Sequence, residues 1–284
     1  MNLKKLELLS QVNLSKLTTI RIGGVSELFF RAQSLEDLRQ FILDHSGNIR
    51  ILGNGSNLLI KNKIIREPVL KLGEEFSYIR GDRYCLEVGA GTMNSLLQNY
   101  CLKENLGGLE YLAGIPATVG GMLRMNASSF DCAISDRIIE IVAIDRQGNL
   151  KTYFKEDISF KYRSSSLSDC IIVAAKFRLS QDIGIHQKIN LYLKKRLSRQ
   201  DFKFPSCGCV FKNPQAESAG ALIDSCGLKG RLHGGAQVSN KHANFIVNLG
   251  NAIYDDVDYL INTVKEQVYK KHNLLLEEEV IRWT

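Results

Sequence analysis

The spacing of apolar residues along the chain predicts four helices. In the first, Leu35, Leu38 and Ile42 share one helical face, preceded by Ser34, a residue type that often begins helices, and followed by Gly47. In the last, apolar residues recur three and four apart, with acidic residues at the start and lysines at the end, as the helix dipole favours. The four predicted helices cover residues 34–47, 95–105, 189–199 and 253–271.

Short apolar runs bounded by glycine or polar residues predict the strands. Residues 138–144 and 150–154 flank a polar turn, Asp145 to Asn149, and this pattern is typical of a β-hairpin. Because the strands and helices do not alternate as regular βαβ units, the pattern favours an α+β fold over a doubly wound parallel sheet. Further strands are predicted at residues 49–52, 58–60, 84–88, 171–179 and 274–283.

Length and composition are those of a folded protein with more than one core. The chain has 284 residues, of which 44% are hydrophobic and 24% charged, and this size suits two or three subdomains. Apolar runs fall far short of the roughly 20 residues that a membrane helix needs. The start, Met1 to Glu7, has no apolar core typical of a secretory signal. We therefore expect a cytoplasmic protein that does not associate with membranes.

The cysteines and the net charge bear on which metals and ligands the chain could bind, and they leave several ligands possible. The seven cysteines are scattered, which favours reduced thiols, and the close pair Cys207 and Cys209 has no second pair at zinc-ligand spacing, so no metal is expected. The net charge of +7 suits anionic partners such as nucleic acid, phosphorylated cofactors or sugar nucleotides, and charge alone does not choose among them. The densest basic patch comprises Lys194, Lys195, Arg196, Arg199 and Lys203.

A glycine-rich turn, Gly53-Asn54-Gly55-Ser56-Asn57, lies between two predicted strands. Glycines allow close approach of the backbone and point successive N–H groups into one concavity, which suits a diphosphate. A plain hairpin turn is the alternative. The turn matches neither common nucleotide fingerprint, because Leu58 stands where the dinucleotide motif needs glycine and no P-loop lysine follows.

A second glycine-rich segment runs from Gly107 to Gly121 and on to Asn126. Its glycines and one proline, within a mostly apolar stretch, exclude an ordinary amphipathic helix. Main chain wrapped against a flat or phosphorylated ligand is one interpretation, and a buried structural loop is the other.

Two such segments, roughly sixty residues apart, resemble the FAD-binding fold of the p-cresol methylhydroxylase type, in which two α+β subdomains hold the flavin. Later motifs narrow the resemblance. These motifs are Thr19 to Gly24, Tyr162-Arg163-Ser164-Ser165, Ser206 to Pro214, Ala219 to Asp224, Gly227 to Gly230, Gly234 to Ser239, His242 to Asn248, and Leu276 to Val280. With them, the chain from Thr19 to the C-terminus resembles the shorter class of the UDP-N-acetylenolpyruvoylglucosamine reductase (MurB) family.

This resemblance implies a domain organisation. Residues 1–64 and 65–180 would form two FAD-binding subdomains, and residues 181–284 an α/β substrate-binding domain whose C-terminal strand returns Glu279 to the active site. We expect a monomer.

The resemblance also implies a reaction and its catalytic residues. NADPH would reduce FAD, and flavin N5 would pass hydride to the enolpyruvyl methylene of UDP-N-acetylglucosamine enolpyruvate, giving UDP-N-acetylmuramate for peptidoglycan synthesis. Arg163 and Glu279 would flank the carboxylate on which negative charge develops, with Glu279 protonated through a raised pKa, and Cys209 would donate the proton. Without the family context, Arg163 would be interpreted as part of a surface ion pair and Glu277 to Glu279 as a solvated acidic run.

The family's binding residues carry over by position. We expect Tyr162, Lys212 and Asn213 to contact the UDP-sugar. Arg199 is expected to contact it too, and one or more of Arg199, Arg196 and Lys203 would bind its diphosphate. The residues expected to bind FAD are Gly53, Asn54, Gly55, Ser56, Asn57, Leu58, Gly114, Ile115, Pro116, Thr118, Val119, Gly120, Gly121 and Asn126.

The chain departs from the family pattern at three positions. The family commonly has serine as proton donor, in the setting Ser-x-Phe-Lys-Asn-Pro, whereas this chain has Cys209. A thiol, with an ordinary pKa of about 8.5, can still protonate carbon, so we interpret the change as functional. A small buried side chain in an inactive site is the alternative. Ala117 and Ser128 replace glycines usual in the family and are expected to loosen flavin contacts.

Two other functions compete. Another flavin oxidoreductase on the same fold, such as an alcohol oxidase, is argued against by the Cys209 to Pro214 motif and Glu279. A basic nucleic-acid-binding module is argued against because the chain lacks aromatic-interleaved basic repeats and helix-turn-helix or zinc signatures. A hydrolase is rejected because His233-Gly234-Gly235 has no accompanying Gly-x-Ser-x-Gly motif.

Overall fold

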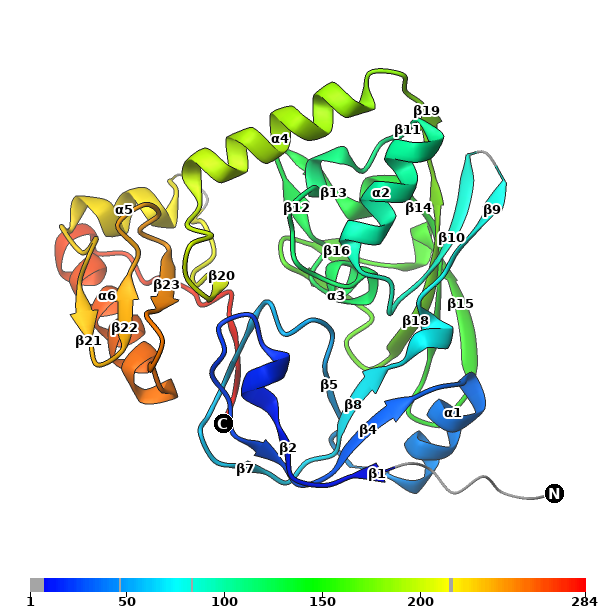
Figure 1. Ribbon diagram of the computed structural model, residues 1–284, viewed down its shortest axis with the longest axis horizontal. Coiled ribbons are helices and arrows are strands. Elements are labelled where there is room, and N and C mark those ends of the chain that lie inside the picture. The colour runs from blue at the N-terminus through cyan, green and yellow to red at the C-terminus, as the bar shows by residue number, and fades with distance from the viewer. Residues whose placement is uncertain (1–7, 46, 83, 215–216) are drawn as a thin grey trace. The chain divides into compact units, whose positions relative to one another are not determined.

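The computed structural model describes residues 8–45, 47–82, 84–214 and 217–284, so the N-terminal residues that bear on the secretory-signal expectation lie outside it (Figure 1). The chain forms two compact units, each assembled from separate stretches of sequence. The first unit contains the chain up to Ser10, Leu28–Asn54 and Glu67–Lys195; the second contains Gln11–Glu27, Gly55–Arg66 and Arg196–Thr284.

The first unit begins with a four-stranded sheet covered by helix α1 (Leu35–Asp44). The Ser34 hydroxyl accepts a hydrogen bond from the Asp37 N–H at 3.1 Å, which confirms the predicted helix start. Leu38 and Phe41 of the helix are buried against this sheet in one core. The sheet order is β1 (Leu8–Leu9), β4 (Phe29–Ala32), β8 (Val69–Leu72), β5 (Arg50–Ile51), with β4, β8 and β5 parallel.

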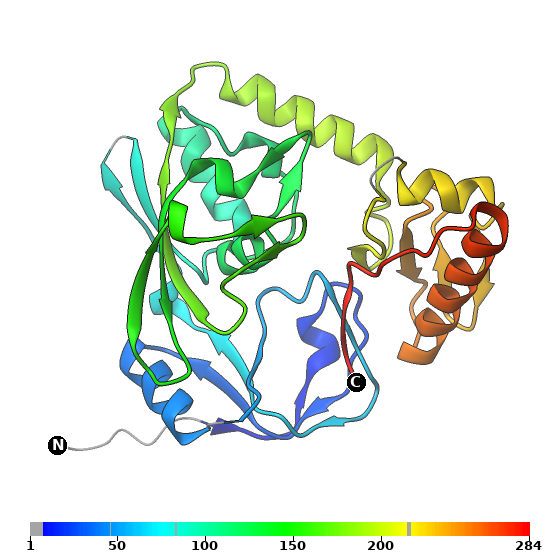
Figure 2. The same ribbon diagram turned by 180° about the vertical axis from the view of Figure 1, so that it is seen from behind.

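An antiparallel five-stranded sheet forms the rest of the first unit's framework and is seen from both sides in Figure 1 and Figure 2. The hairpin predicted at residues 138–144 and 150–154 is confirmed with the same bounds. Helices α2 (Asn94–Glu104) and α3 (Val119–Arg124) pack with this sheet in a second core. The strand order is β15 (Leu150–Phe154), β14 (Ile138–Ile144), β18 (Ile171–Arg178), β10 (Cys85–Gly89), β9 (Ile79–Asp82).

Three two-stranded ladders complete the first unit. The turn between the strands of one of them carries Tyr162 and Arg163. The pairs are β11 (Leu106–Gly107) with β19 (Ser180–Gln181), β12 (Ser128–Ser129) with β13 (Cys132–Ala133), and β16 (Phe160–Lys161) with β17 (Ser164–Ser165). Helix α4 (Ile185–Arg199) follows, and the boundary between the units falls within it.

The second unit is built around helix α6 (Tyr254–His272). Its predicted apolar stripe is confirmed from Val257 onward, because Val257, Leu260, Ile261, Val264 and Val268 are at most 1% exposed. Each such side chain contributes roughly 1.5–3 kcal/mol by leaving water. Ile253, the predicted first member, precedes the helix and is 48% exposed. The other elements are α5 (Ala219–Ser225); the ladder β2 (Val12–Asn13), β3 (Val25–Ser26), β7 (Ile64–Ile65); the sheet β20 (Ser206–Cys209), β23 (Phe245–Asn248), β22 (Ala236–Val238), β21 (Leu232–His233); and the parallel pair β6 (Leu58–Ile60) with β24 (Ile281–Trp283).

One predicted strand is too long, and the hairpin alternative for the first glycine-rich turn is wrong. The strand predicted over residues 274–283 is confined to β24, because only Ile281–Trp283 find ladder partners, in β6. The glycine-rich turn at residues 53–57 does not close a hairpin, because β5 pairs with β8 and β6 pairs with β24. Helix α4 also begins earlier than predicted, at Ile185. The three-part domain division at 64/65 and 180/181 stays a prediction. Over the part of the chain that is described, no helix has both the length and the apolarity to cross a bilayer.

Candidate active site

In the first unit, the Gly53-Asn54 end of the first glycine-rich turn is tied to the second glycine-rich segment. The Asn54 Nδ2 donates a hydrogen bond to the Pro116 carbonyl at 2.7 Å. A Cβ at Gly53 would lie 2.9 Å from the Thr118 Oγ1, so only glycine fits at this approach. Lys71 of β8 donates to the Gly53 carbonyl at 2.5 Å, and burial, with the nearby charge of Arg31, lowers the Lys71 pKa. The two segments predicted to bind cofactor therefore meet here.

The second glycine-rich segment is a loop held by amides that sequence analysis did not identify. Buried Asn94 of α2 donates to the carbonyls of Leu112 at 2.7 Å and Ile115 at 3.0 Å. Gln98, one turn later, donates to the Leu109 carbonyl at 2.9 Å. Two amides four residues apart in a helix next to a glycine-rich loop are the sequence signal for this arrangement, because a buried loop needs partners for its carbonyls.

Thr118 ends this loop and starts helix α3. Its hydroxyl accepts a hydrogen bond from the Gly121 N–H at 3.3 Å and so caps the helix. Thr118 and Val119 are buried, Gly120 and Gly121 are half-buried, and Gly114 is exposed with φ +82°.

Asn126 carries an unsatisfied buried acceptor. The side chain is 8% exposed, and its Nδ2 donates to the Lys161 carbonyl at 3.2 Å. Among the described residues its Oδ1 has no hydrogen-bond partner. Such an atom costs about 1–3 kcal/mol, which a ligand bearing a hydrogen-bond donor would recover.

Arg163 is held in a defined orientation by Ser128. Its guanidinium donates to the Ser128 hydroxyl at 2.7 Å and to the Ser128 carbonyl at 3.3 Å, and it lies 4.9 Å from the Tyr162 ring centroid. Arg163 sits in the turn between β16 and β17 with φ +57°, a conformation that costs a non-glycine residue roughly 1–3 kcal/mol. Ser128 thus supplies an acceptor to the predicted carboxylate-binding side chain, and the expectation that it loosens a flavin contact stays a prediction.

In the second unit, Cys209 and Glu279 are brought together through Val210. The N–H groups of Glu279 and Val280 both donate to the Val210 carbonyl, at 2.8 and 3.3 Å. Phe211 and Glu278 form an isolated antiparallel bridge beside them. Cys209 and Glu279 are both half-buried. Cys209, which precedes Val210, and Glu279, which donates to the Val210 carbonyl, are thus connected by the same backbone hydrogen bonds although they are far apart in sequence.

The three successive glutamates differ in environment. Glu277 is exposed and pairs with Lys212. Glu278 accepts from Lys265 at 2.6 Å and from Arg282 at 2.6 and 3.0 Å. Burial would raise the Glu278 pKa, but these hydrogen bonds outweigh it and lower the pKa. The interpretation of a solvated acidic run therefore holds for Glu277 and not for Glu278.

The remaining part of the first glycine-rich turn supports the Glu279 segment. Asn57 donates from Nδ2 to the Glu279 carbonyl at 3.0 Å, and its own carbonyl accepts the Ile281 N–H at 3.0 Å. Gly55 has φ +63°, and a Cβ there would collide with the Leu17 carbonyl. Ser56 is half-buried and Leu58 begins β6.

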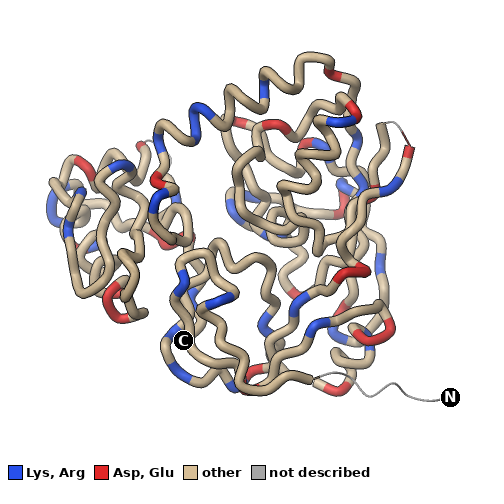
Figure 3. Tube along the Cα trace, viewed as in Figure 1, with Lys and Arg blue, Asp and Glu red and all other residues tan. Residues whose placement is uncertain are grey.

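The predicted substrate residues lie in both units. Tyr162 is 47% exposed in the first unit. In the second, Asn213 accepts the Ala219 N–H at 3.0 Å, and Lys212 has its backbone N–H bound to the Glu277 carbonyl. Arg199 is exposed at the end of α4, a helix whose positive charge is visible in Figure 3.

The two neighbouring cysteines have opposite environments. Cys207 is buried, which raises the pKa of its thiol to about 12, whereas Cys209 is half-buried. In the described part of the chain, His, Cys, Asp and Glu side chains form no group of three or more suited to a metal ion.

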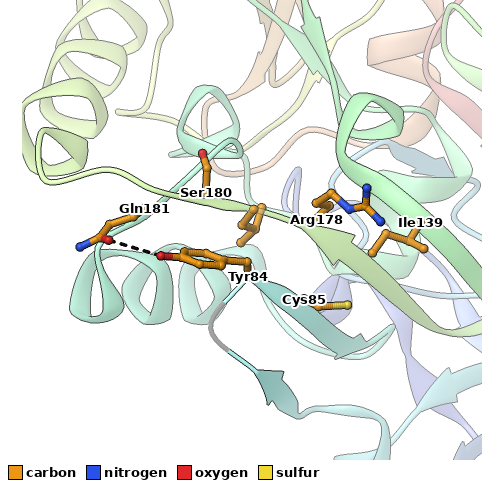
Figure 4. A pocket seen from close by; sticks show the side chains of 7 residues that line it. Tyr84, Cys85, Ile139, Arg178, Ser180 and Gln181 are labelled. Atoms are coloured by element: carbon orange, nitrogen blue, oxygen red, sulfur yellow. Dashed lines mark hydrogen bonds between the residues drawn. The ribbon is translucent and has the colours of Figure 1, made fainter.

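A pocket of about 340 Å³ lies elsewhere in the first unit, next to β10 and β18 (Figure 4). The Tyr84 hydroxyl donates to Gln181 at 3.3 Å across it. It contains none of the predicted site residues, because its lining comprises Tyr84, Cys85, Ile139, Arg178, Leu179, Ser180 and Gln181.

Comparison with known proteins agrees with this geometry. A model of the FAD binding domain matches residues 27–153, and a model of the UDP-N-acetylenolpyruvoylglucosamine reductase C-terminal domain matches residues 200–283. UDP-N-acetylenolpyruvoylglucosamine reductases of Orientia tsutsugamushi and Desulforamulus reducens are 36% and 37% identical, over 94% and 95% of this chain and 91% and 92% of their own lengths.

A solved structure extends the agreement to three dimensions. The crystal structure of UDP-N-acetylenolpyruvylglucosamine reductase (MurB) from Thermus caldophilus matches with a TM-score of 0.87 and 34% identity, over 98% of this chain and all of that one. The expected α+β FAD-binding fold with an additional C-terminal domain is thereby confirmed. Since identity, coverage and fold agree along nearly the whole sequence, this chain belongs to the UDP-N-acetylenolpyruvoylglucosamine reductase family.

Proposed function

We propose that the chain catalyses the NADPH-dependent, FAD-mediated reduction of UDP-N-acetylglucosamine enolpyruvate to UDP-N-acetylmuramate, a step of peptidoglycan precursor synthesis. Family membership supports the reaction class. The observation that carries the assignment is the convergence of Cys209 and Glu279 on Val210. We further propose that the protein acts as a cytoplasmic monomer.

The residues of the first unit fit FAD. The unsatisfied Asn126 Oδ1 offers an acceptor to a ligand donor, and glycine at position 53 lets the first glycine-rich turn approach Thr118 closely. Asn54, bound to Pro116, holds the two glycine-rich segments together. These residues would hold the cofactor, and FAD when bound supplies the hydride that NADPH provides.

Arg163 is proposed to bind the enolpyruvyl carboxylate. Its planar fork suits a carboxylate, and the hydrogen bond to Ser128 fixes the guanidinium before substrate arrives. A fixed positive charge stabilises the negative charge that spreads onto the carboxylate once hydride has reached the methylene carbon. Glu279, in its protonated form, would donate a further hydrogen bond to this group.

Cys209 is proposed to complete the reduction. Its S–H would give a proton to the carbon next to the carboxylate, so that one hydride and one proton have been added across the double bond. The thiolate then regains a proton from solvent, to which the half-buried side chain has access. Tyr162, Lys212, Asn213 and Arg199 would contact the UDP-sugar.

Anaerobic turnover tests the reaction and separates it from the alternative flavin oxidoreductase. NADPH should bleach the flavin, and the enolpyruvyl sugar nucleotide should restore its colour, whereas simple alcohols should not reduce it. Reduction by an alcohol, with no reoxidation by the sugar nucleotide, would replace the proposal with the alternative.

The role of Cys209 predicts a specific pH profile. Because a thiol must be protonated to act as an acid, kcat/KM should fall as pH rises through the thiol range, near pH 8.5. Cys209→Ser should retain turnover and lose this alkaline limb, since an alcohol does not ionise there. Cys209→Ala should lose roughly 10²–10⁴-fold in kcat, the usual contribution of a general acid. A full rate in Cys209→Ala would remove the residue from the mechanism.

Alkylation provides an independent check. Iodoacetamide near neutral pH should modify Cys209 and inactivate the enzyme, while Cys207, buried and with its pKa raised to about 12, stays unmodified. Peptide mass spectrometry locates the modified thiol. Alkylated Cys209 with undiminished turnover contradicts the proposal.

A further inference from the structure

We propose that Asn244 is a positioning residue that fixes Cys209 and, through the same backbone, the Glu279 segment. The inference rests on the proposed function for its catalytic consequence and on the contacts of Asn244 for its structural part. Asn244 stands immediately before β23, lies within a motif already noted in the sequence, and is 2% exposed.

Asn244 makes three hydrogen bonds to the two residues that follow Cys209. Its Oδ1 accepts the Phe211 N–H at 2.9 Å, and its Nδ2 donates to the Phe211 carbonyl at 2.8 Å. Its backbone carbonyl accepts the Val210 N–H at 2.9 Å. The Asn244 side chain thus binds both the N–H and the carbonyl of Phe211, as a residue of a neighbouring strand would.

This side chain replaces a ladder partner at an irregular point of the sheet. Strands β20 and β23 pair Ser206 with Val247 and Cys209 with Phe245, and the register shifts between these two pairs. Beyond Cys209 the pairing of β20 with β23 ends, and Asn244 supplies the next partners. Because a bulged strand aims its side chains differently from a regular one, the clamp on Phe211 sets where the Cys209 side chain lies.

The same clamp reaches the Glu279 segment through the backbone. Val210, held by the Asn244 carbonyl, accepts the Glu279 N–H with its own carbonyl. Phe211, held by the Asn244 side chain, pairs with Glu278. Asn244 therefore fixes Val210 and Phe211, the residues that connect to both proposed acids, Cys209 and Glu279. A displacement of about 1 Å at such a point can cost about 10²-fold in rate.

Asn248 offers a matched control in the same strand. It is 3% exposed and makes three side-chain hydrogen bonds, against two for the Asn244 side chain. Its Nδ2 donates to the Ile20 carbonyl, and its Oδ1 accepts the N–H groups of Gly250 and Ala252. Substitution by leucine removes the side-chain partner of two backbone groups at Asn244 and of three at Asn248, so the loss of stability in the control should be at least as large. Only Asn244 contacts the residues next to Cys209 through its side chain.

The test compares Asn244→Leu with Asn248→Leu in the FAD-loaded enzyme. We measure urea stability, kcat and KM for NADPH and the sugar nucleotide, and the rate of Cys209 alkylation located by mass spectrometry. Asn244→Leu should lower kcat about 10- to 100-fold with KM for NADPH unchanged, and should alter the Cys209 alkylation rate several-fold. Asn248→Leu should lose at least as much stability and keep both kcat and the alkylation rate.

The outcomes separate the two proposals. An alkylation rate and kcat in Asn244→Leu equal to those in Asn248→Leu overturn the positioning role. A changed alkylation rate together with full turnover in Cys209→Ala supports the positioning role and rejects the proposed proton donor. If Asn244→Leu does not fold, Asn244→Asp replaces it: aspartate keeps the shape and the acceptor for the Phe211 N–H but loses the donor to the carbonyl, and an unchanged Cys209 reactivity and kcat there refute the inference.

Discussion

At the scale of single residues, Arg163 depends on its neighbour Ser128. The Ser128 hydroxyl accepts the guanidinium N–H at 2.7 Å. Arg163 also holds a left-handed backbone conformation, with φ +57°. The orientation of the Arg163 side chain depends both on this backbone conformation and on its hydrogen bond to Ser128. Loss of that hydrogen bond should therefore lower the rate of catalysis.

Replacement of Ser128 by alanine tests this dependence. Alanine removes the hydroxyl acceptor, and the remaining carbonyl contact at 3.3 Å is the weaker of the two. We expect kcat/KM for the sugar nucleotide to fall by about 1 kcal/mol of transition-state stabilisation, or roughly fivefold, because the guanidinium is half-buried and partly solvated.

The conservative variant Ser128→Thr is the control, since threonine keeps an acceptor at the same atom. It should recover most of the rate. Equal rates for the alanine variant and the unmodified enzyme, measured by NADPH oxidation, would show that the Ser128 hydroxyl is not needed to orient Arg163. Affinity for FAD, followed by flavin fluorescence, should change less than kcat/KM in both variants.

At the scale of elements, the C-terminal segment is held on helix α6 by an ion-pair network. Glu278 binds Arg282 and Lys265, and Arg282 also pairs with Asp258 and donates to the Tyr254 hydroxyl. Side chains in the network are 18–37% exposed, so each pair is worth more than a surface ion pair but less than a fully buried one. Two members of the network, Glu278 and Arg282, flank Glu279 in the sequence, so the network holds the segment that carries Glu279.

Glu278→Gln should destabilise the protein by about 1–2 kcal/mol at neutral pH, measured by urea unfolding. Since the pKa of Glu278 is lowered in the folded protein, its contribution is present above the ordinary value, near pH 4.3, and is lost as pH falls through the lowered value. The stability difference between variant and unmodified protein should therefore shrink below pH 4.

Glu277→Gln is the matched control for this prediction. Its side chain is 72% exposed and forms one ion pair, with Lys212, so its removal should change the stability by no more than about 0.5 kcal/mol. A pH-independent difference for Glu278→Gln, or equal effects of the two variants, would contradict the assigned network.

Helices and strands whose side-chain periodicity lies within a single segment could be predicted from the sequence. The hairpin at residues 138–154 and the stripe of α6 follow from side-chain periodicity, which each segment carries by itself. The strand predicted over residues 274–283 is longer than the observed one, because a strand needs a partner and β6 pairs with three residues only, Ile281–Trp283. The hairpin alternative at residues 53–57 was wrong for the same reason.

The candidate site shows the same division. Glycines, Arg163, Cys209 and Glu279 could be identified from motifs, since the chemistry of these residue types is local. The residues that support them are harder to identify. Asn94 and Gln98 leave only one signal in the sequence, the spacing of two amides in a helix next to a glycine-rich loop. Asn244 becomes visible only when the fold shows which backbone groups lack ladder partners and where an amide takes their place.

At the scale of the whole molecule, hydrophobic cores follow the division into units. Two cores lie in the first unit, one built on each of its larger sheets, and a third lies in the second unit around α6. Their buried members do not overlap between units. A chain with separate cores need not unfold in one step, and a ligand held by residues of one core stabilises that core first.

The single tryptophan makes this testable. Trp283, 4% exposed in β24, belongs to the second unit, so its emission maximum reports unfolding there, whereas circular dichroism reports both units. FAD at about 100 times its Kd stabilises whatever binds it by roughly 2.7 kcal/mol, or about 5–10 °C for a unit of this size. Because most of the residues expected to bind FAD, among them Asn54, Thr118 and Asn126, are in the first unit and the rest are in the second, removal of FAD should lower the midpoint seen by circular dichroism by that amount and shift the Trp283 midpoint less. Coincident shifts of both midpoints would show instead that the two units unfold as one cooperative structure.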